Sequence, residues 1–180
     1  MCGIVGAVAD RNVVPILVEG LQRLEYRGYD SAGVAVVADD GSLGLSRTVG
    51  KVAELEEKLT QNPLQGQIGV AHTRWATHGG VTEANAHPHV SGGRVAVIHN
   101  GIIENFQPIK DEMLEKGYQF DSETDTEVAA HLIYDYLEQG LDLVDAVGKA
   151  VERFEGAYAL LVVDAEDPNR IVVSRVASPL

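Results

Sequence analysis

Cysteine is almost missing from this chain: Cys2 is the single cysteine among 180 residues. One cysteine excludes an intramolecular disulfide, and it also excludes a zinc site built on several thiolates. The position of this cysteine, directly after Met1, makes it the most informative residue of the composition.

Basic residues are also scarce. The chain has 14 Lys and Arg against 27 Asp and Glu, which gives a formal net charge of −13. A field of that sign repels a phosphate backbone, so nucleic acid is not an expected partner.

Long apolar runs are absent as well. No window approaches the roughly 20 apolar residues that a membrane-spanning helix needs. Residues 1–11 lack the basic start of an export signal, and their apolar run ends at Asp10. We therefore expect a cytoplasmic protein with no membrane partner.

The remaining composition is that of a globular protein. Hydrophobic residues make up 45% and charged residues 23% of the chain, so neither disorder nor a fibrous repeat is indicated. The length is close to the prior of about 150 residues per domain, and no linker or internal repeat interrupts it. We predict one domain over residues 1–180.

Apolar and β-branched runs alternate with helical periodicity along the chain. The strands are expected at 2–9, 31–38, 68–71, 94–99, 158–163 and 171–174, with a hairpin turn at 39–41 leading into one more strand through Thr48. The helices are expected at 12–26, 52–59, 105–116, 124–139 and 142–154. The polar segment after Ala71, as far as Gly93, has no periodicity and is predicted to be a loop. The fold class is α+β.

Cys2 can supply both a nucleophile and its base. If Met1 is removed, the residue carries a thiol and a free α-amine. An α-amino group has a pKa of about 7.7–8.0, so near neutral pH it is partly uncharged and can accept the thiol proton. The alternative is that Cys2 is a small apolar residue at the start of a buried strand.

An acyl-transfer site also needs donors for a developing oxyanion. Asn100 and Gly101 follow a predicted strand and offer a side-chain amide beside an unhindered backbone N–H. The alternative is a plain turn, because Asn-Gly is the commonest hairpin dipeptide.

Arg74 and Asp125 have opposite charges and would suit a ligand that carries both a carboxylate and an ammonium group. Each also has a structural interpretation. Arginines are common on surfaces, and an aspartate near the start of a helix interacts favourably with the helix dipole.

Histidines are concentrated in one part of the chain, at positions 72, 78, 87, 89 and 99. His87 and His89 could chelate a metal ion, but Pro88 stiffens the pair and no HExxH motif occurs. We predict no metal and no cofactor.

Several blocks together resemble one family. Residues 2–6 (CGIVG) are similar to the start of class II glutamine amidotransferases, which are N-terminal-nucleophile hydrolases. Longer blocks resemble the glutaminase domain of the glucosamine-6-phosphate synthase family: 24–33 (LEYRGYDSAG), 72–79 (HTRWATHG), 85–89 (NAHPH), 99–105 (HNGIIEN) and 122–127 (SETDTE). The match extends over essentially the whole chain. One departure is Ala177, because a glycine is usual before the Ser-Pro-Leu that follows it.

The resemblance implies a four-layer αββα sandwich with Cys2 at the end of a central strand. It also implies roles for particular residues. Cys2 would be the nucleophile, and the Asn100 side chain and the Gly101 N–H would bind the oxyanion. The residues that would hold the α-carboxylate and α-amino groups of L-glutamine are Arg74, Thr77, His78 and Asp125. Trp75 would belong to a loop that closes over glutamine, and Arg27 would be a supporting residue near the nucleophile.

The implied reaction is hydrolysis of L-glutamine to glutamate and ammonia through a γ-glutamyl thioester on Cys2. In the family this reaction supplies ammonia for making glucosamine 6-phosphate from fructose 6-phosphate. The sugar-phosphate isomerase region that uses the ammonia is absent from this sequence and would be a partner of this domain in a full-length enzyme. Two alternatives stay open: another N-terminal-nucleophile amidohydrolase, and a non-catalytic module that binds glutamine for regulation.

Overall fold

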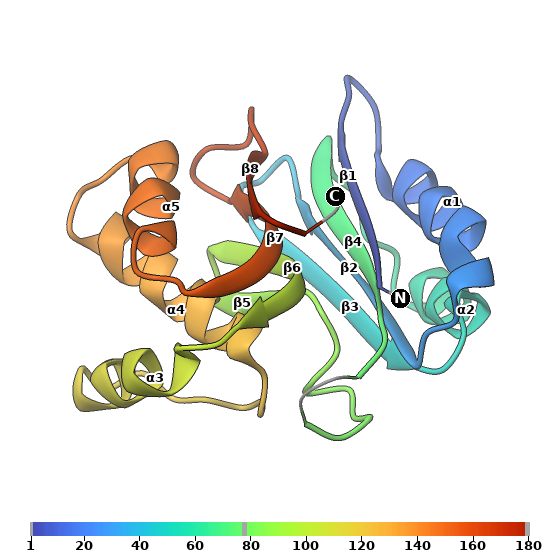
Figure 1. Cartoon of the computed structure of the whole chain (residues 1–180). Coiled ribbons are helices and arrows are strands. Elements are labelled where there is room, and N and C mark those ends of the chain that lie inside the picture. The colour runs from blue at the N-terminus through green and yellow to red at the C-terminus, as the bar shows by residue number, and fades with distance from the viewer. Residues whose placement is uncertain (1, 77–78, 179–180) are drawn as a thin grey trace.

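The strands of the chain form two four-stranded antiparallel sheets in a computed structural model that describes residues 2–76 and 79–178. The first sheet has the order β1 (Gly3–Val8), β4 (Ile68–Arg74), β2 (Ser31–Val37) and β3 (Leu43–Val49). The second sheet has the order β5 (His89–Ser91), β6 (Val95–Ile103), β7 (Gly156–Asp164) and β8 (Val172–Val176). In Figure 1 the two sheets lie face to face at the centre of the molecule.

Helices cover the two outer faces of the sheets (Figure 1). The first sheet is covered by α1 (Val14–Leu24), which continues into a short 3-10 helix at Glu25–Arg27, and by α2 (Val52–Gln61). The second sheet is covered by α4 (Asp125–Glu138) and α5 (Leu143–Val151), and α3 (Phe106–Glu115) packs against α4.

The alternation of side chains along each strand produces separate apolar layers. On β2, Val34 and Val36 pack in the core beneath α1 and α2, whereas Ala35 and Val37 face the second sheet. β2 therefore buries both faces, which explains why it is apolar almost throughout.

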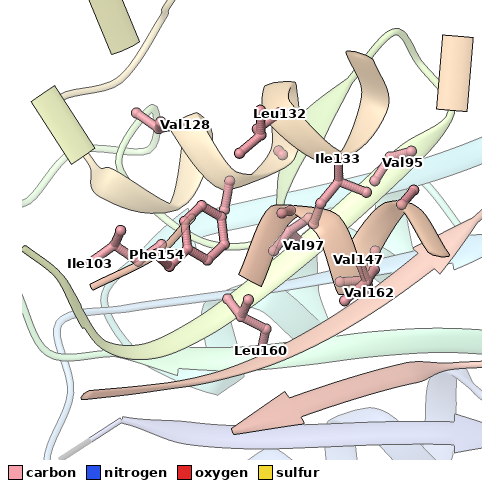
Figure 2. Close-up of a cluster of buried hydrophobic side chains, with 14 of the residues drawn as sticks. Val95, Val97, Ile103, Val128, Leu132, Ile133, Val147, Phe154, Leu160 and Val162 are labelled. Atoms are coloured by element: carbon pink, nitrogen blue, oxygen red, sulfur yellow. The ribbon is translucent and has the colours of Figure 1, made fainter. Parts of the chain in front are cut away.

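The second sheet divides its side chains in the same way. Leu160 and Val162 of β7 pack under α4 and α5, as Figure 2 shows, while Leu161 and Val163 of the same strand join the layer between the sheets. Three apolar layers around two sheets make a four-layer αββα sandwich, which confirms the predicted fold class.

The ends of α3 and α4 show local features that fit their sequence. The Thr124 hydroxyl accepts a hydrogen bond from the Glu127 backbone N–H and caps α4. Gly117 and Gly140 follow α3 and α4 with φ of 92° and 91°, a conformation that glycine adopts without steric cost.

Most boundaries differ from the sequence prediction by a few residues, and the differences near the predicted site matter most. β4 continues to Arg74, and the short strand β5 lies inside the segment that was predicted to be a loop. β6 continues to Ile103, so Asn100 and Gly101 lie within a strand and the turn interpretation is wrong. The reason is tertiary pairing: Asn100 and Gly101 lie opposite Ala159 and Tyr158 of β7, which overrides the turn preference of the dipeptide.

Within the described residues, no helix combines the length and apolar character that crossing a bilayer requires.

Candidate active site

The pairing of β1 with β4 places Cys2 beside the end of β4. Gly3 lies opposite Thr73, and its backbone N–H donates to Thr73 Oγ1 at 3.0 Å. A Cβ at Gly3 would lie 2.7 Å from that oxygen, so only glycine permits this approach. Cys2 thus directly precedes β1 and lies next to Arg74 and Trp75. The expectation of a central strand is wrong, because among the described residues β1 pairs only with β4 and forms the edge of its sheet.

The backbone of Trp75 holds the Cys2 sulfur. The Trp75 N–H donates to Cys2 Sγ at 3.2 Å, and the thiol lies 3.8 Å from the Trp75 carbonyl oxygen as a weak donor. The Trp75 side chain itself is 54% exposed, and its ring lies over Gly28, where an added Cβ would be 3.1 Å from the ring. The nucleophile candidate is therefore fixed by main-chain groups beside a half-exposed indole.

The second sheet brings Asn100 and Gly101 to the same place from β6. The Asn100 Nδ2 group donates to the Cys2 carbonyl oxygen at 3.4 Å. Gly101 has φ of 110°, and a Cβ there would lie 2.1 Å from the Ala157 carbonyl oxygen. The positive φ and the close approach of the Ala157 carbonyl oxygen each require glycine at this position.

Asp125 is the first residue of α4, and its side chain is buried with 6% exposure. Its Oδ2 accepts a hydrogen bond from the Ile103 backbone N–H at 2.8 Å, which ties the start of α4 to the end of β6. A carboxylate at a helix N-terminus interacts favourably with the helix dipole, so the structural interpretation of Asp125 holds together with any role in binding.

Arg74 is the last residue of β4 and is only 4% exposed. Its Nη1 donates to the Gly80 carbonyl oxygen at 3.3 Å. Gly80 is held in turn, because its N–H donates to Glu123 Oε2 at 3.1 Å and its carbonyl oxygen also accepts from Asn85 Nδ2 at 3.0 Å. Gly80, which Arg74 contacts, is thereby anchored to Glu123 just before α4.

These residues surround one cavity of about 200 Å³. Cys2, Arg74, Trp75, Gly101, Asp125 and Thr126 are among the residues that line it. A thiol, a guanidinium and a carboxylate therefore face the same space.

Four predicted site residues are not among the described residues that line the cavity: Asn100, Thr77, His78 and Arg27. Asn100 lies next to the lining residue Cys2, to whose carbonyl oxygen its amide donates. Thr77 and His78 lie outside the described residues, so their predicted roles stay predictions. Arg27 lies in the 3-10 helix, where its Nε donates to the Tyr26 hydroxyl at 3.3 Å and its guanidinium lies 5.7 Å from the centre of the Tyr26 ring. Arg27 is not among the residues that line the cavity.

Sequence reasoning missed that His72, His87 and His89 pack together as buried, neutral side chains. Burial lowers the pKa of His72 to about 3, and it lowers the pKa of His87 and His89 well below the usual value. The nearby positive charge of Arg74 acts in the same direction on all three. His87 and His99 line the cavity. The uncharged rings of His72, His87 and His89 therefore do not compete with Arg74 for an anion.

In the described ranges, 2–76 and 79–178, no group of three His, Cys, Asp or Glu side chains is placed to share a metal ion. The clustered rings contact one another and polar side chains: His89 Nε2 lies 2.9 Å from Thr124 Oγ1, and His99 Nδ1 lies 2.9 Å from Thr126 Oγ1.

The sequence matches the family described as glutamine amidotransferase domain over residues 72–177. It is 58% identical over 180 residues to a glutamine–fructose-6-phosphate aminotransferase [isomerizing] of Pseudomonas putida, and 59% identical to the protein of that name from Idiomarina loihiensis. Each alignment covers 100% of this chain and 30% of the relative. The chain thus spans about a third of the length of the curated relatives that it matches.

Two solved structures have a similar fold. A glutamine phosphoribosylpyrophosphate amidotransferase from B. subtilis superposes with a TM-score of 0.76 and 27% identity, covering 91% of this chain and 35% of that protein. A second structure, described as the allosteric regulatory enzyme of purine biosynthesis, gives a TM-score of 0.80 and 28% identity over 97% of this chain and 37% of that protein.

Proposed function

Because this chain belongs to the glutamine amidotransferase family, we propose that its cavity binds L-glutamine and hydrolyses the side-chain amide to give glutamate and ammonia. One observation carries the proposal most directly. The single thiol of the chain, a buried arginine and a buried aspartate all face one cavity of about 200 Å³.

Arg74 and Asp125 match the two charged groups of a free amino acid. The guanidinium of Arg74 offers parallel N–H donors to the α-carboxylate, a fork that a lysine lacks. Asp125 uses Oδ2 for the Ile103 N–H, and its Oδ1 is the proposed acceptor for the α-ammonium group. Thr77 and His78, which follow Arg74 in the sequence, complete the proposed set that holds the amino-acid head group.

The proposed reaction begins when the Cys2 α-amine, exposed by removal of Met1, takes the thiol proton. The sulfur attacks the carbonyl carbon of the glutamine side-chain amide and forms a tetrahedral intermediate. The C–N bond then breaks, the protonated amine returns its proton to the leaving nitrogen as ammonia forms, and a γ-glutamyl thioester remains. Water attacks the thioester, releasing glutamate and the thiol.

The negative oxygen of the tetrahedral intermediate needs hydrogen-bond donors. We assign this role to the Asn100 Nδ2 group and the Gly101 N–H, since the first donates to the Cys2 carbonyl and the second belongs to a residue that lines the cavity. Removing one such donor in other enzymes costs about 3 kcal/mol of transition-state stabilisation.

Trp75 is the proposed cover of the bound substrate. Its indole is half-exposed over Gly28 at the edge of the cavity, while its backbone binds the Cys2 sulfur. Arg27, in the neighbouring 3-10 helix, is proposed only as a support for this region.

The names of the relatives suggest the use of the ammonia. We propose that in a full-length protein this domain delivers ammonia to a sugar-phosphate isomerase partner that acts on fructose 6-phosphate. The cytoplasm is the proposed location, where a free thiol stays reduced.

The direct test measures ammonia and glutamate released from glutamine by the purified chain. Equal amounts of both are expected, and Cys2→Ala should abolish release while the far-ultraviolet circular dichroism is unchanged. Because Cys2 is the only thiol, intact mass after iodoacetamide treatment reports on the nucleophile alone. A folded Cys2→Ala variant that still releases ammonia would contradict the mechanism, as would an active native chain that retains Met1.

A further inference from the structure

A buried histidine forms a hydrogen bond with the side-chain oxygen of Asn100, the amide atom other than the nitrogen that donates to Cys2. His72 Nε2 lies 2.8 Å from Asn100 Oδ1, and the His72 side chain has no exposed surface. His72 belongs to β4 of the first sheet and Asn100 to β6 of the second, so this hydrogen bond crosses the layer between the sheets.

The two ends of an amide differ in chemistry: the oxygen only accepts hydrogen bonds, and the nitrogen only donates them. Asn100 can present Nδ2 to Cys2 only while its Oδ1 faces a donor on the other side. His72 must therefore carry its proton on Nε2. The opposite tautomer would offer a lone pair to Oδ1 and would favour the rotated amide, with its oxygen toward the nucleophile.

A second histidine selects this tautomer. His87 Nδ1 lies 3.0 Å from His72 Nδ1, and burial keeps both rings uncharged because it lowers the pKa of each. Two neutral ring nitrogens at this distance can form a hydrogen bond only if one of them carries a proton and the other has a lone pair. When His87 donates that proton, His72 accepts at Nδ1 and is left to donate at Nε2.

This assignment also accounts for His87 Nε2. That atom is buried, and among the described residues no hydrogen-bond partner reaches it. A bare lone pair without a partner costs less than a buried N–H without one, because carbonyl and imine lone pairs are the more tolerated exceptions in protein interiors. The geometry thus favours the proton on His87 Nδ1.

We infer that His72 and His87 are positioning residues that act through Asn100: a relay of two imidazoles fixes which end of the amide faces the Cys2 nucleophile. The inference rests on the proposed glutaminase function. Neither ring needs to touch the reacting atoms, since the relay works from behind the donor.

The first test uses two substitutions of similar size. His72→Gln keeps an N–H donor close to the position of Nε2, whereas His72→Asn has no group that reaches Asn100 Oδ1. For glutamine hydrolysis we expect His72→Asn to lower kcat about 10- to 100-fold, with KM nearly unchanged because Arg74 and Asp125 are intact. His72→Gln should recover most of the lost kcat.

The same substitution in an Asn100→Ala background separates positioning from a general structural effect. If His72 acts through Asn100, His72→Asn should cost nothing further once the amide is gone. An equal loss of kcat in both backgrounds would overturn the inference, and so would a folded His72→Asn variant with native kcat. Urea unfolding and alkylation of Cys2 verify that each variant is folded.

A spectroscopic readout on the native chain completes the test without any substitution. Long-range ¹H–¹⁵N correlation spectra should show His72 protonated on Nε2 and His87 protonated on Nδ1. An active native chain with His72 protonated on Nδ1 would overturn the relay alone. A native chain with no release of ammonia would overturn the proposed function, and the catalytic role of the relay with it.

Discussion

The Asp125 carboxylate joins the start of α4 to the end of β6, because its Oδ2 accepts the Ile103 backbone N–H at 2.8 Å. The same side chain lines the cavity beside Cys2. The Asp125 carboxylate thus has a structural role and a proposed role in binding the substrate. Substitutions can separate these two roles.

Asp125→Asn should raise the KM for glutamine about 10- to 100-fold, since it keeps an oxygen for the Ile103 N–H and removes the charge that would attract the α-ammonium group. Stability should change by less than about 1 kcal/mol, the usual size of a helix-dipole interaction. Asp125→Ala is the matched control: it should also destabilise the fold by about 1–3 kcal/mol, because the buried N–H loses its acceptor. An unchanged KM for Asp125→Asn would remove Asp125 from the site.

Arg74→Lys should raise the KM for glutamine about 10- to 100-fold, because a lysine keeps the charge and loses the forked pair of hydrogen bonds to the α-carboxylate. The difference should shrink for glutaminamide, in which that carboxylate is blocked. Arg23→Lys, on the exposed surface of α1, is the control and should leave KM unaltered. Steady-state ammonia release measures all three, and equal KM values for Arg74→Lys and the native chain would contradict the assignment.

As the pH is lowered, the fold should lose stability in a pH range above the one in which carboxylates become protonated. Burial lowers the pKa of His72 to about 3 and that of His87 and His89 well below the usual value. Below pH about 6.5 these histidines therefore bind protons in the unfolded chain but not in the folded chain. The free energy of unfolding is highest above that pH and decreases as the pH falls below it. Each buried histidine contributes a slope of about 1.4 kcal/mol per pH unit.

Urea unfolding between pH about 5 and 7.5 measures this slope, which should reach about 4 kcal/mol per pH unit for the three rings together. In His89→Gln the slope should fall by the contribution of one ring. A stability that is flat over this range would show that the histidines are protonated in the folded chain.

Ala177→Gly should stabilise the fold. Ala177 has φ of 52°, the left-handed region that costs an alanine roughly 1–2 kcal/mol. Part of the gain is offset by the greater freedom of glycine in the unfolded chain, so a net increase of about 0.5 kcal/mol is expected in the free energy of unfolding. Ala157→Gly on β7, an exposed strand position, should instead destabilise by about 0.5–1 kcal/mol. Equal effects of the two substitutions would contradict the conformational argument.

Much of the fold was accessible from the sequence because it follows from local signals. Apolar periodicity located each of the helices α1 to α5 of the described residues. The four-layer arrangement came from the resemblance.

The parts that the sequence did not predict depend on contacts between distant segments. Asn100 and Gly101 have the local preference of a turn, but pairing with β7 keeps them in a strand. The contact between His72 and His87 has no periodic signature either, because one residue lies on a strand and the other in an irregular segment. The family resemblance supplied the residues of the candidate site, but it could not indicate which imidazole nitrogen faces Asn100.

Because the residues of the site come from two different sheets, catalytic activity reports whether the two sheets have packed together. Cys2 precedes β1 and Arg74 ends β4 in one sheet, whereas Asn100 and Gly101 belong to the other. The apolar layer between the sheets keeps them together, with the hydrogen bonds that Asn100 makes to His72 and Cys2. Any partly folded form in which the sheets have separated would keep its helices and much of its circular dichroism while the thiol no longer faced its oxyanion donors. Ammonia release during refolding would therefore time the docking of the two sheets, separately from the formation of either one.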